Sequence, residues 1–246
     1  RIHLKLDTGM KRLGIEKKQI GDLKKFMQGK NISVLSVFSH LSASDEKDHD
    51  DFTSFQFEQF RLMLERLEGS FSIPPLRHIL NSAGIVRFPD QQMDMVRLGI
   101  GLYGIDTSDG LLPELQAIST LKARISQIKY IRSRQSVGYN RAYRARKNYT
   151  RIATVSIGYA DGLARSTGNE KYSLLIRGKQ AKIIGVICMD MCMVDITKIP
   201  NARVGDEVII FGENPTIQEL ADVMGTIPYE VLTAISDRVK RVYLMD

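Results

Sequence analysis

The sequence predicts two parts: an α/β part that forms the second half of a (β/α)8 TIM-type barrel, and a β-rich C-terminal domain. First, strand-like and amphipathic helical segments alternate through about the first 115 residues, which is typical of parallel β/α units. Second, the later segments are short strand-like runs separated by Gly, Asn and Asp turns. Third, the first part has room for about four β/α units, whereas a closed barrel typically takes ~250 residues. We therefore expect domains at residues 1–116 and 117–246.

Hydrophobic spacing locates the elements of the first domain. Two helical faces are expected, one through Ile20, Leu23, Phe26 and Met27 and one through Phe57, Phe60, Leu64 and Leu67. Apolar runs predict strands over residues 2–6, 32–38 and 95–103, and Pro89 marks a turn between the last two. Residues 106–113 contain Asp, Gly and Pro and indicate a connector.

The second domain is expected to be built from short strands. They are predicted over residues 123–131, 152–157, 182–188, 193–196 and 207–211. Apolar residues at helical spacing over 217–224 and 229–235 predict two helices at the end of the chain.

Composition sets limits on the class of protein. With 43% hydrophobic and 26% charged residues, the chain is typical of a globular protein and is neither disordered nor collagen-like. We expect a cytoplasmic protein, because the sequence shows neither a membrane span nor a secretory signal. Two cysteines, Cys188 and Cys192, are too few for a disulfide framework, and their spacing without a neighbouring His predicts no metal site.

Positive charge is concentrated in one segment. The net charge is +7, and residues 122–151 contain ten Lys or Arg and no acidic residue. Such a segment suits phosphate groups of nucleic acid or of a small ligand. It is also typical of a solvated strand-and-loop face, and it lacks the aromatic interleaving of a single-strand binder and matches no helix-turn-helix or finger motif. We expect a solvated face and no nucleic-acid partner.

Polar residues follow three expected strands, the third of which ends just before Asn81, and lie near a fourth; β/α proteins gather their functional groups at such places. Asp7–Arg12, Ser39-His40, Asn81-Ser82 and Arg97–Gly101 offer cations, a histidine, a hydroxyl and exposed backbone, which suit an anion and a proton transfer. Alone, each has an ordinary explanation: a histidine in a core, a helix cap or a turn.

Taken in order, these segments and three in the second domain resemble alanine racemases. The motifs are Asp-Thr-Gly-Met-Lys-Arg at 7–12, Phe-Ser-His at 38–40, Asn-Ser at 81–82, Arg-Leu-Gly-Ile-Gly at 97–101, Val-Gly-Tyr at 137–139, Gly-Tyr-Ala-Asp-Gly at 158–162 and Cys-Met-Asp at 188–190. The Gly-Tyr-Asn-Arg form at 138–141 also resembles racemase modules fused to a cell-wall peptide ligase. The resemblance implies a head-to-tail homodimer that interconverts L- and D-alanine for peptidoglycan synthesis, with pyridoxal 5'-phosphate as cofactor.

The resemblance also implies roles for residues of the first domain. Arg97 would hydrogen-bond the pyridine nitrogen of the cofactor and keep it unprotonated. Arg12 would approach the phenolic oxygen and contact substrate, and Lys5, often carbamylated in the family, would orient Arg12. The remaining cofactor-binding residues would be His40, Asn81, Ser82, Gly99 and Ile100, of which Ser82, Gly99 and Ile100 would hold the phosphate.

Residues of the second domain would act on substrate. Tyr139 would be the base for the L-enantiomer and would reach the cofactor of the partner subunit, with His40 linking it to Arg97. Tyr159 would narrow the entrance, and Met189 and Asp190 would line the region that receives the substrate carboxylate. Because racemisation needs a proton acceptor on each face of a planar carbanion, bases from two subunits make chemical sense.

The sequence departs from the family at two points. The family attaches its cofactor to a lysine in a Lys-Ala-x-Ala-Tyr-Gly motif, which also supplies its second base, and these 246 residues do not contain that motif. We therefore expect the chain to be a portion of a racemase that is inactive alone; on residues alone, Lys5 would be the candidate lysine. Asp237 stands where some members have a tyrosine that reaches the phosphate, and we expect it to turn away or to pair with Arg238.

Two other functions stay open from the sequence. One is a related barrel decarboxylase of basic amino acids, although its cysteine-centred motif is not evident. The other is a non-catalytic dimerisation or nucleic-acid-binding module that uses residues 122–151. The choice between alanine and serine as substrate is also open.

Overall fold

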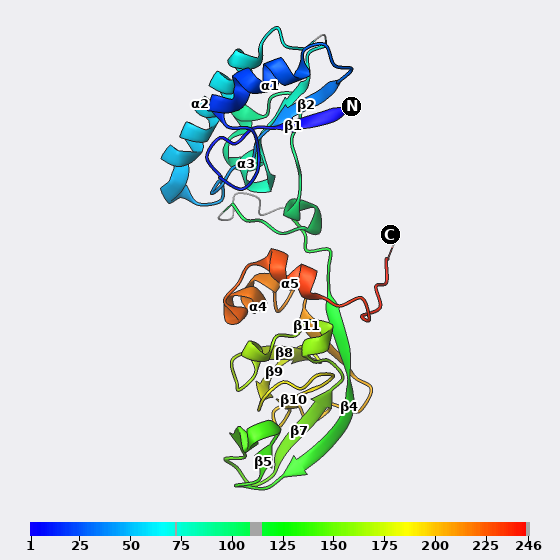
Figure 1. The fold of residues 1–246 in the computed structure, drawn as a ribbon. Helices are drawn as coiled ribbons and strands as arrows, with labels where there is room; N and C mark the ends of the chain where they lie inside the picture. The colour runs from blue at the N-terminus through cyan, green and yellow to red at the C-terminus, as the bar shows by residue number, and fades with distance from the viewer. Residues whose placement is uncertain (72, 109–114, 245–246) are drawn as a thin grey trace. The chain divides into compact units, whose positions relative to one another are not determined.

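The computed structural model describes residues 1–71, 73–108 and 115–244, and the connector predicted over 106–113 lies partly outside them. The chain divides into two compact units, residues 1–116 and 117–246 (Figure 1).

Unit 1 is built on a three-stranded parallel sheet. Its strands, in spatial order, are β1 (Ile2–Lys5), β2 (Val34–Phe38) and β3 (Leu76–His78). The register sets Lys5 opposite Phe38, and Phe38 opposite His78. Because all three strands run the same way, the residues that follow them emerge at one edge of the sheet.

Two helices, α1 (Ile20–Met27) and α2 (Asp50–Leu67), pack beside this sheet (Figure 1). The core between them contains Leu6, Val37, Phe60 and Leu67, none of which is exposed. The helical spacing that predicted α1 and α2 marks most of the faces they bury. Phe26 is the exception, because it was expected on the buried face of α1 and is 57% exposed. A third, short helix, α3 (Ser82–Arg87), follows β3 and starts at Asn81, whose Oδ1 accepts a hydrogen bond from the Gly84 N–H.

The strand predicted over residues 95–103 is wrong. That segment is irregular up to Gly99 and then forms a 3-10 helix over Ile100–Tyr103. Apolar residues alternate there as in a strand, but Leu98 and Leu102 are 50% and 60% exposed, and Gly104 ends the turn with a φ of 71°. Within the described residues unit 1 thus has three strands of the expected sheet, and a complete set of four β/α units is not present.

Unit 2 is a closed six-stranded antiparallel barrel with the strand order β10-β7-β4-β11-β8-β9. The strands are β4 (Leu121–Ile131), β7 (Thr150–Val155), β8 (Ser173–Ile176), β9 (Lys179–Ile184), β10 (Cys192–Asp195) and β11 (Glu207–Phe211). Strand β8 has no counterpart among the predicted strands. Alternate residues such as Leu174 and Ile176 point inward and are fully buried, which is the pattern of a filled barrel.

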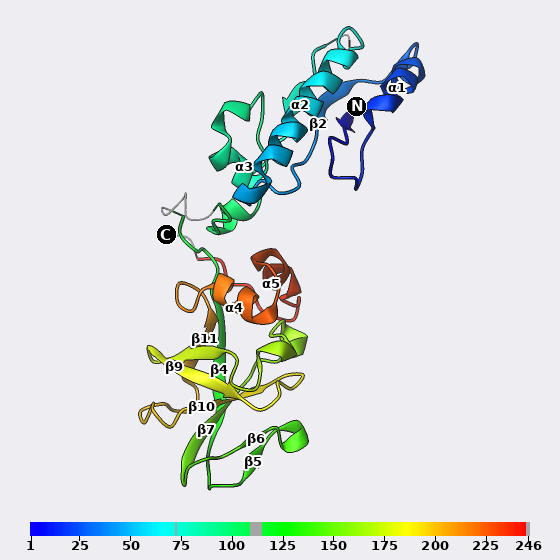
Figure 2. The same ribbon diagram turned by 90° about the vertical axis from the view of Figure 1, so that its left-hand side faces the viewer.

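Short elements complete unit 2. Strands β5 (Ser136–Val137) and β6 (Tyr143–Arg144) form a small ribbon, and the helices α4 (Ile217–Met224) and α5 (Pro228–Ala234) follow the barrel (Figure 2). Helix α4 has the bounds expected from sequence, and a capping box between Thr216 and Glu219 fixes its start.

Several basic residues of the segment 122–151 form ion pairs or hydrogen bonds within unit 2. Lys122 lies 3.0 Å from Glu207, Arg146 lies 2.8 Å from Glu170, and the Arg124 side chain donates to the Gly205 carbonyl. Arg151 donates to the carbonyls of Ile199, Pro200 and Ala202. These contacts give the four residues a structural role within unit 2.

Three further features bear on the class of protein. Among the helices of the described residues, none has the length and apolar character needed to cross a bilayer. Cys188 and Cys192 are free thiols. In the same residues, no three His, Cys, Asp or Glu side chains gather as a metal site would require.

Candidate functional site

Arg97 is the centre of the polar cluster in unit 1. Its Nη1 donates to Nδ1 of His78 at 2.6 Å, and its Nη2 lies 3.2 Å from Nδ1 of His40. The same Nη2 donates to the carbonyls of Ser39 and Ile79 at 2.8 and 3.0 Å. Its Nε–H has no acceptor among the described residues. The guanidinium is therefore fixed at Nη1 and Nη2, and its Nε–H can donate to a ligand.

His78 was not predicted from sequence as part of the site. It is 4% exposed and stacks on Phe38, with 5.1 Å between ring centroids. A guanidinium has no acceptor, so Nδ1 of His78 must be unprotonated. Its Nε2 then donates to Ser36 Oγ at 3.1 Å, which leaves the Ser36 hydroxyl to donate to Nδ1 of His3 at 2.7 Å.

Both histidines that contact Arg97 are held neutral. Burial, followed by the charges of Arg97, Arg12 and Lys5, lowers the pKa of His40 to about 4. Burial and the charge of Arg97 lower the pKa of His78 to about 4 as well. Because Nδ1 of neutral His40 accepts from Arg97, its proton lies on Nε2. His40 therefore presents a hydrogen-bond donor.

Lys5 and Arg12 lie within electrostatic reach of the same cluster. Burial and the nearby charge of Arg12 lower the pKa of Lys5. Arg12 is exposed and follows a tight turn, in which Asp7 Oδ1 accepts from the N–H groups of Gly9 and Lys11. Within the described residues, neither cationic head has a hydrogen-bond partner. Both are thus available to a ligand.

A buried glutamine supports the loops that carry these side chains. Gln56 on α2 is not exposed, and its Nε2 donates to Thr8 Oγ1 and to the His40 carbonyl at 3.2 and 3.1 Å. The Thr8 hydroxyl also lies 2.8 Å from the Ser39 hydroxyl. This network ties the loop after β1 to the loop after β2. Gln56 was also missed from sequence, because it stands among helix residues with no motif.

Ser82 brings the predicted phosphate residues together. Its Oγ accepts from the N–H of Gly99 at 2.9 Å and lies 3.4 Å from that of Gly101. A Cβ at position 99 would lie 3.5 Å from this oxygen. The Ser82 O–H and the Ile100 N–H have no acceptor among the described residues. Asn81, in contrast, is occupied, because its Oδ1 caps α3 and accepts from the Ser44 hydroxyl at 2.7 Å.

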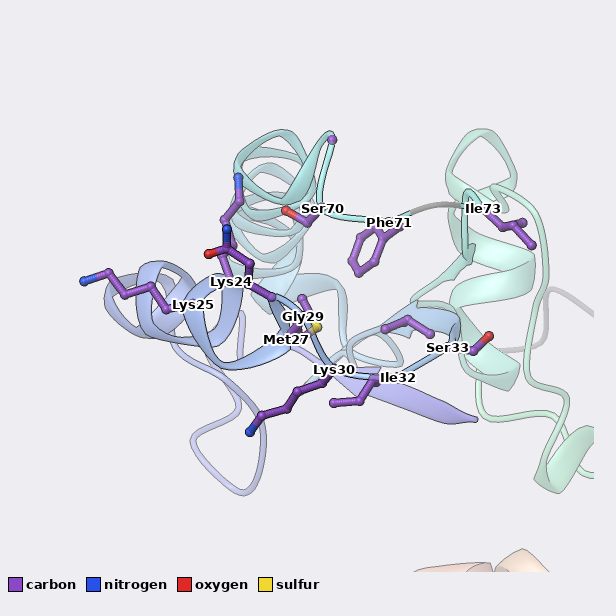
Figure 3. Close-up of a pocket in the computed structure, with 13 residues that line it drawn as sticks. Lys24, Lys25, Met27, Gly29, Lys30, Ile32, Ser33, Ser70, Phe71 and Ile73 are labelled. Atoms are coloured by element: carbon purple, nitrogen blue, oxygen red, sulfur yellow. The ribbon is translucent and has the colours of Figure 1, made fainter.

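The described residues of unit 1 line two cavities that bear on the location of the site. A cavity of about 490 Å³ lies where β2 begins, at the opposite end of that strand from His40, and none of the candidate residues lines it (Figure 3). A smaller one of about 80 Å³ is lined in part by Ser82, Leu98 and Gly101. Only the second adjoins the candidate site.

In unit 2, backbone hydrogen bonds join the loops that carry Tyr159 and Met189. The N–H of Tyr159 donates to the Cys188 carbonyl, and that of Ala160 to the Met189 carbonyl, both at 3.0 Å. A Cβ on Gly158 would lie 2.3 Å from both carbonyl oxygens, so glycine is required there. The backbones that carry Tyr159 and Met189 are therefore adjacent.

Arg238 connects the same loops through its side chain. Its Nε donates to Asp161 Oδ1 at 2.7 Å and its Nη2 to Asp190 Oδ1 at 2.5 Å. The pairing expected between Asp237 and Arg238 is not present. Asp237 turns outward, with Arg241 at 3.8 Å as its cationic neighbour.

Tyr139 lies in a loop of its own. Gly138, with a φ of 73°, turns the chain after β5 and places Tyr139 at the start of a 3-10 helix. The tyrosine is 67% exposed, and its hydroxyl has no hydrogen-bond partner in the described part of the chain. Its position suits contact with another molecule.

Comparisons with known proteins agree for both units. Residues 1–107 match the family model for the alanine racemase N-terminal domain, and residues 118–243 match that for the C-terminal domain. An alanine racemase of Desulfovibrio desulfuricans is 39% identical over 99% of the chain. The chain spans 66% of the length of that relative.

Solved structures give the same result. The alanine racemase of Bacillus anthracis with bound L-Ala-P is 31% identical, with a TM-score of 0.90 over 99% of this chain and 64% of that one. The alanine racemase of Bartonella henselae with covalently bound pyridoxal phosphate is 30% identical, with a TM-score of 0.88 over 98% and 66%.

Proposed function

The chain belongs to the alanine racemase family, and on that premise we propose that it carries cofactor- and substrate-binding residues of an enzyme that interconverts L- and D-alanine with pyridoxal 5'-phosphate. The observation that carries the proposal is the environment of Arg97. Two histidine nitrogens and two carbonyls hold the guanidinium along one edge, and no acceptor for its Nε–H occurs in the part of the chain that the structure describes. The D-alanine produced would serve peptidoglycan synthesis.

The donor set fits this cofactor. A guanidinium donates only and keeps its charge, so Arg97 suits a pyridine nitrogen that accepts a hydrogen bond and is not protonated. The Ser82 hydroxyl and the Ile100 N–H suit a phosphate. Gly99 would contribute through the space left by its missing Cβ, because its N–H is committed to Ser82. Asn81 would act indirectly, by capping the helix that carries Ser82.

When bound, the cofactor supplies an electron sink that makes the α-proton of alanine acidic. The residues of this chain would then position substrate and move that proton. Arg12, which is exposed and has no hydrogen-bond partner among the described residues, would orient the substrate and the phenolic oxygen, with Lys5, carbamylated, as its support. His40 would donate from Nε2 toward the hydroxyl of Tyr139 from a partner subunit.

Tyr139 would take the proton from the L-enantiomer. Its exposed and unpartnered hydroxyl supports a role across a head-to-tail homodimer interface. Tyr159 would narrow the entrance, and Met189 and Asp190 would receive the substrate carboxylate. The Asp190 carboxylate is occupied by Arg238, so backbone N–H groups of this loop are the more suitable donors to a substrate anion.

The same proposal assigns a part to each unit. Unit 1 would be part of a (β/α)8 barrel and hold the cofactor, which its parallel strands and helices support. Unit 2 would supply substrate and dimer contacts. Free thiols at Cys188 and Cys192 support a reducing, cytoplasmic setting.

Cofactor titration tests the proposal directly. Pyridoxal 5'-phosphate should bind the chain with a change in its absorbance near the visible edge, and Arg97→Gln should weaken this binding. Arg61→Gln, which alters an exposed arginine paired with Glu58 on α2, is the control. Equal affinity of the Arg97 and Arg61 variants would count against the proposal, as would DNA binding in place of cofactor binding.

A further inference from the structure

Arg238 lies at the junction of three segments of unit 2. It belongs to the segment after α5, and its guanidinium contacts Asp161 in the loop 158–162 and Asp190 in the loop 188–191. The three residues are far apart in sequence, with 77 positions between Asp161 and Arg238. One side chain thus joins three segments through hydrogen bonds to two carboxylates.

The Asp161 carboxylate extends this connection into its own loop. Its Oδ2 accepts from the Gly158 N–H at 2.8 Å, while its Oδ1 accepts from Arg238. Gly158 in turn packs against the carbonyls of Cys188 and Met189. Asp161 is therefore fixed from both sides, and the hydrogen bonds from Arg238 and Gly158 lower its pKa against the effect of burial.

We propose that Arg238 is a positioning residue that holds the Tyr159 and Met189 loops at a fixed separation and thereby sets the width of the opening for a small amino acid. The two side chains that would line this opening, Tyr159 and Met189, are 44% and 54% exposed and have no side-chain hydrogen bonds among the described residues. Their positions depend on the backbone beneath them. Arg238 holds that backbone in place through its hydrogen bonds to Asp161 and Asp190.

The fork of an arginine matters for this role. The planar guanidinium reaches one carboxylate with Nε and the other with Nη2, whereas a lysine ammonium is a single point charge. Arg238→Lys should keep one of the two contacts. It should therefore restore part of what Arg238→Gln loses.

The inference rests on the proposed function for the identity of the substrate, but not for the geometry of the loops. Amide hydrogen exchange on the 246-residue chain tests the geometry without any activity. In Arg238→Gln, the N–H groups of Tyr159 and Ala160 should exchange about tenfold faster, since their acceptors lie on the other loop. Arg238→Lys should give an intermediate rate.

Arg177 offers a matched control in the same unit. It contacts Asp206 with Nε and Nη2 at 2.6 and 2.8 Å. Its side chain is 46% exposed, as is that of Arg238, and Asp206 is 15% exposed against 14% for Asp161. Arg177→Gln should leave exchange at Tyr159 and Ala160 unchanged. Equal exchange rates at Tyr159 and Ala160 in the wild type and in Arg238→Gln would overturn the proposed positioning role of Arg238.

Kinetics test the consequence for substrate, in a form of the protein that racemises alanine. Arg238→Gln should raise KM for alanine about tenfold and change kcat less than about threefold, because an opening that loosens affects binding more than proton transfer. A uniform loss of kcat, or an unchanged KM despite faster exchange, would overturn the role in substrate selection. If no form racemises alanine, the proposed function fails. The amide exchange rates still decide whether Arg238 holds the two loops together.

Discussion

The guanidinium of Arg97 donates to Nδ1 of His78 at 2.6 Å, and His78 is 4% exposed beneath it. The contact joins an arginine on an irregular segment to a histidine on strand β3. Through Ser36 it continues to His3 on strand β1. A row of side chains across all three strands therefore supports the residue on which the cofactor proposal depends.

Replacing His78 should destabilise unit 1. His78→Leu removes the acceptor of Arg97 and the partner of Ser36, and an unpaired buried donor costs about 1–3 kcal/mol. Urea unfolding measures this loss. His49→Ala is the control, since His49 is exposed beside Glu46, and it should change the free energy of unfolding by less than about 0.5 kcal/mol. A His78 variant as stable as the control would contradict this account.

Stability should fall as the pH drops from about 6.5 to about 4. His40 and His78 have a pKa of about 4 in the folded chain, below the ordinary value of 6.5. Between these values the unfolded chain binds more protons, so the free energy of unfolding rises with pH through this window and is level above it. Each histidine contributes a slope of at most about 1.4 kcal/mol per pH unit.

Unfolding in urea at a series of pH values from 4.5 to 7.5 checks this slope. His78→Gln should flatten it, because one of the two depressed histidines is removed, and His49→Ala should not. A flat profile in the unaltered chain would show that the two histidines titrate alike in the folded and unfolded states.

Sequence patterns predicted the fold where burial follows a simple period. Helix α4 is an example, because its apolar face and its Thr216–Glu219 cap agree. The failed strand over 95–103 shows the limit of the same reasoning. Alternating apolar residues occur there as well, but glycines at 99 and 101 and the turn at Gly104 favour a 3-10 helix over pairing.

The site was predictable only in part, because sequence patterns report local motifs and not contacts between segments far apart in the chain. His40 follows strand β2, and both His40 and Arg97 stand in motifs, so they could be selected from sequence. His78 could not, because it reads as an ordinary strand residue and its role comes from stacking and from a partner 19 positions away. The contact of Arg238 with Asp161 joins loops that are far apart in sequence, so no local sequence pattern predicts it.

Tyr139→Phe should separate the two directions of the reaction, in a form of the protein that racemises alanine. Loss of the base for the L-enantiomer should slow deuterium incorporation into L-alanine by about 10²–10⁴-fold, and into D-alanine far less. Folding should be unaffected, because the hydroxyl has no partner within the described residues. Tyr149→Phe, which alters a tyrosine that is also 67% exposed, is the control. Equal losses for both enantiomers would argue against a base specific to the L-side.

Asp237→Tyr should leave the affinity for pyridoxal 5'-phosphate unchanged or increase it. The Asp237 side chain is fully exposed and lies 3.8 Å from Arg241, so it offers nothing to a phosphate and would repel one nearby. Asp237→Asn removes the carboxylate charge without adding an aromatic ring, so it separates the effect of the charge from that of the tyrosine ring. A weakening beyond the ~1 kcal/mol of an ordinary hydrogen bond, measured by cofactor titration, would show that the carboxylate has a favourable role.

The 246-residue chain should have no useful racemase activity alone, although it should bind the cofactor weakly. The lysine motif that the family uses for cofactor attachment and for the second base does not occur in it, and loss of both functions should remove many orders of magnitude of rate. Strands β1 and β3 each pair with β2 only among the described strands, which leaves two edges that favour association. We therefore expect dimers or larger assemblies, detectable by light scattering.

An alanine racemisation assay with added cofactor decides this point. Activity should appear when a segment that carries the lysine motif is supplied, either as a separate polypeptide or joined to residue 1. Lys5→Met tests the alternative, because Lys5 lies on β1 near Arg12 and its pKa is lowered, as a lysine that attaches a cofactor requires. Comparable rates with and without the added segment would refute the prediction, and loss of those rates in Lys5→Met would then identify Lys5 as the attachment point.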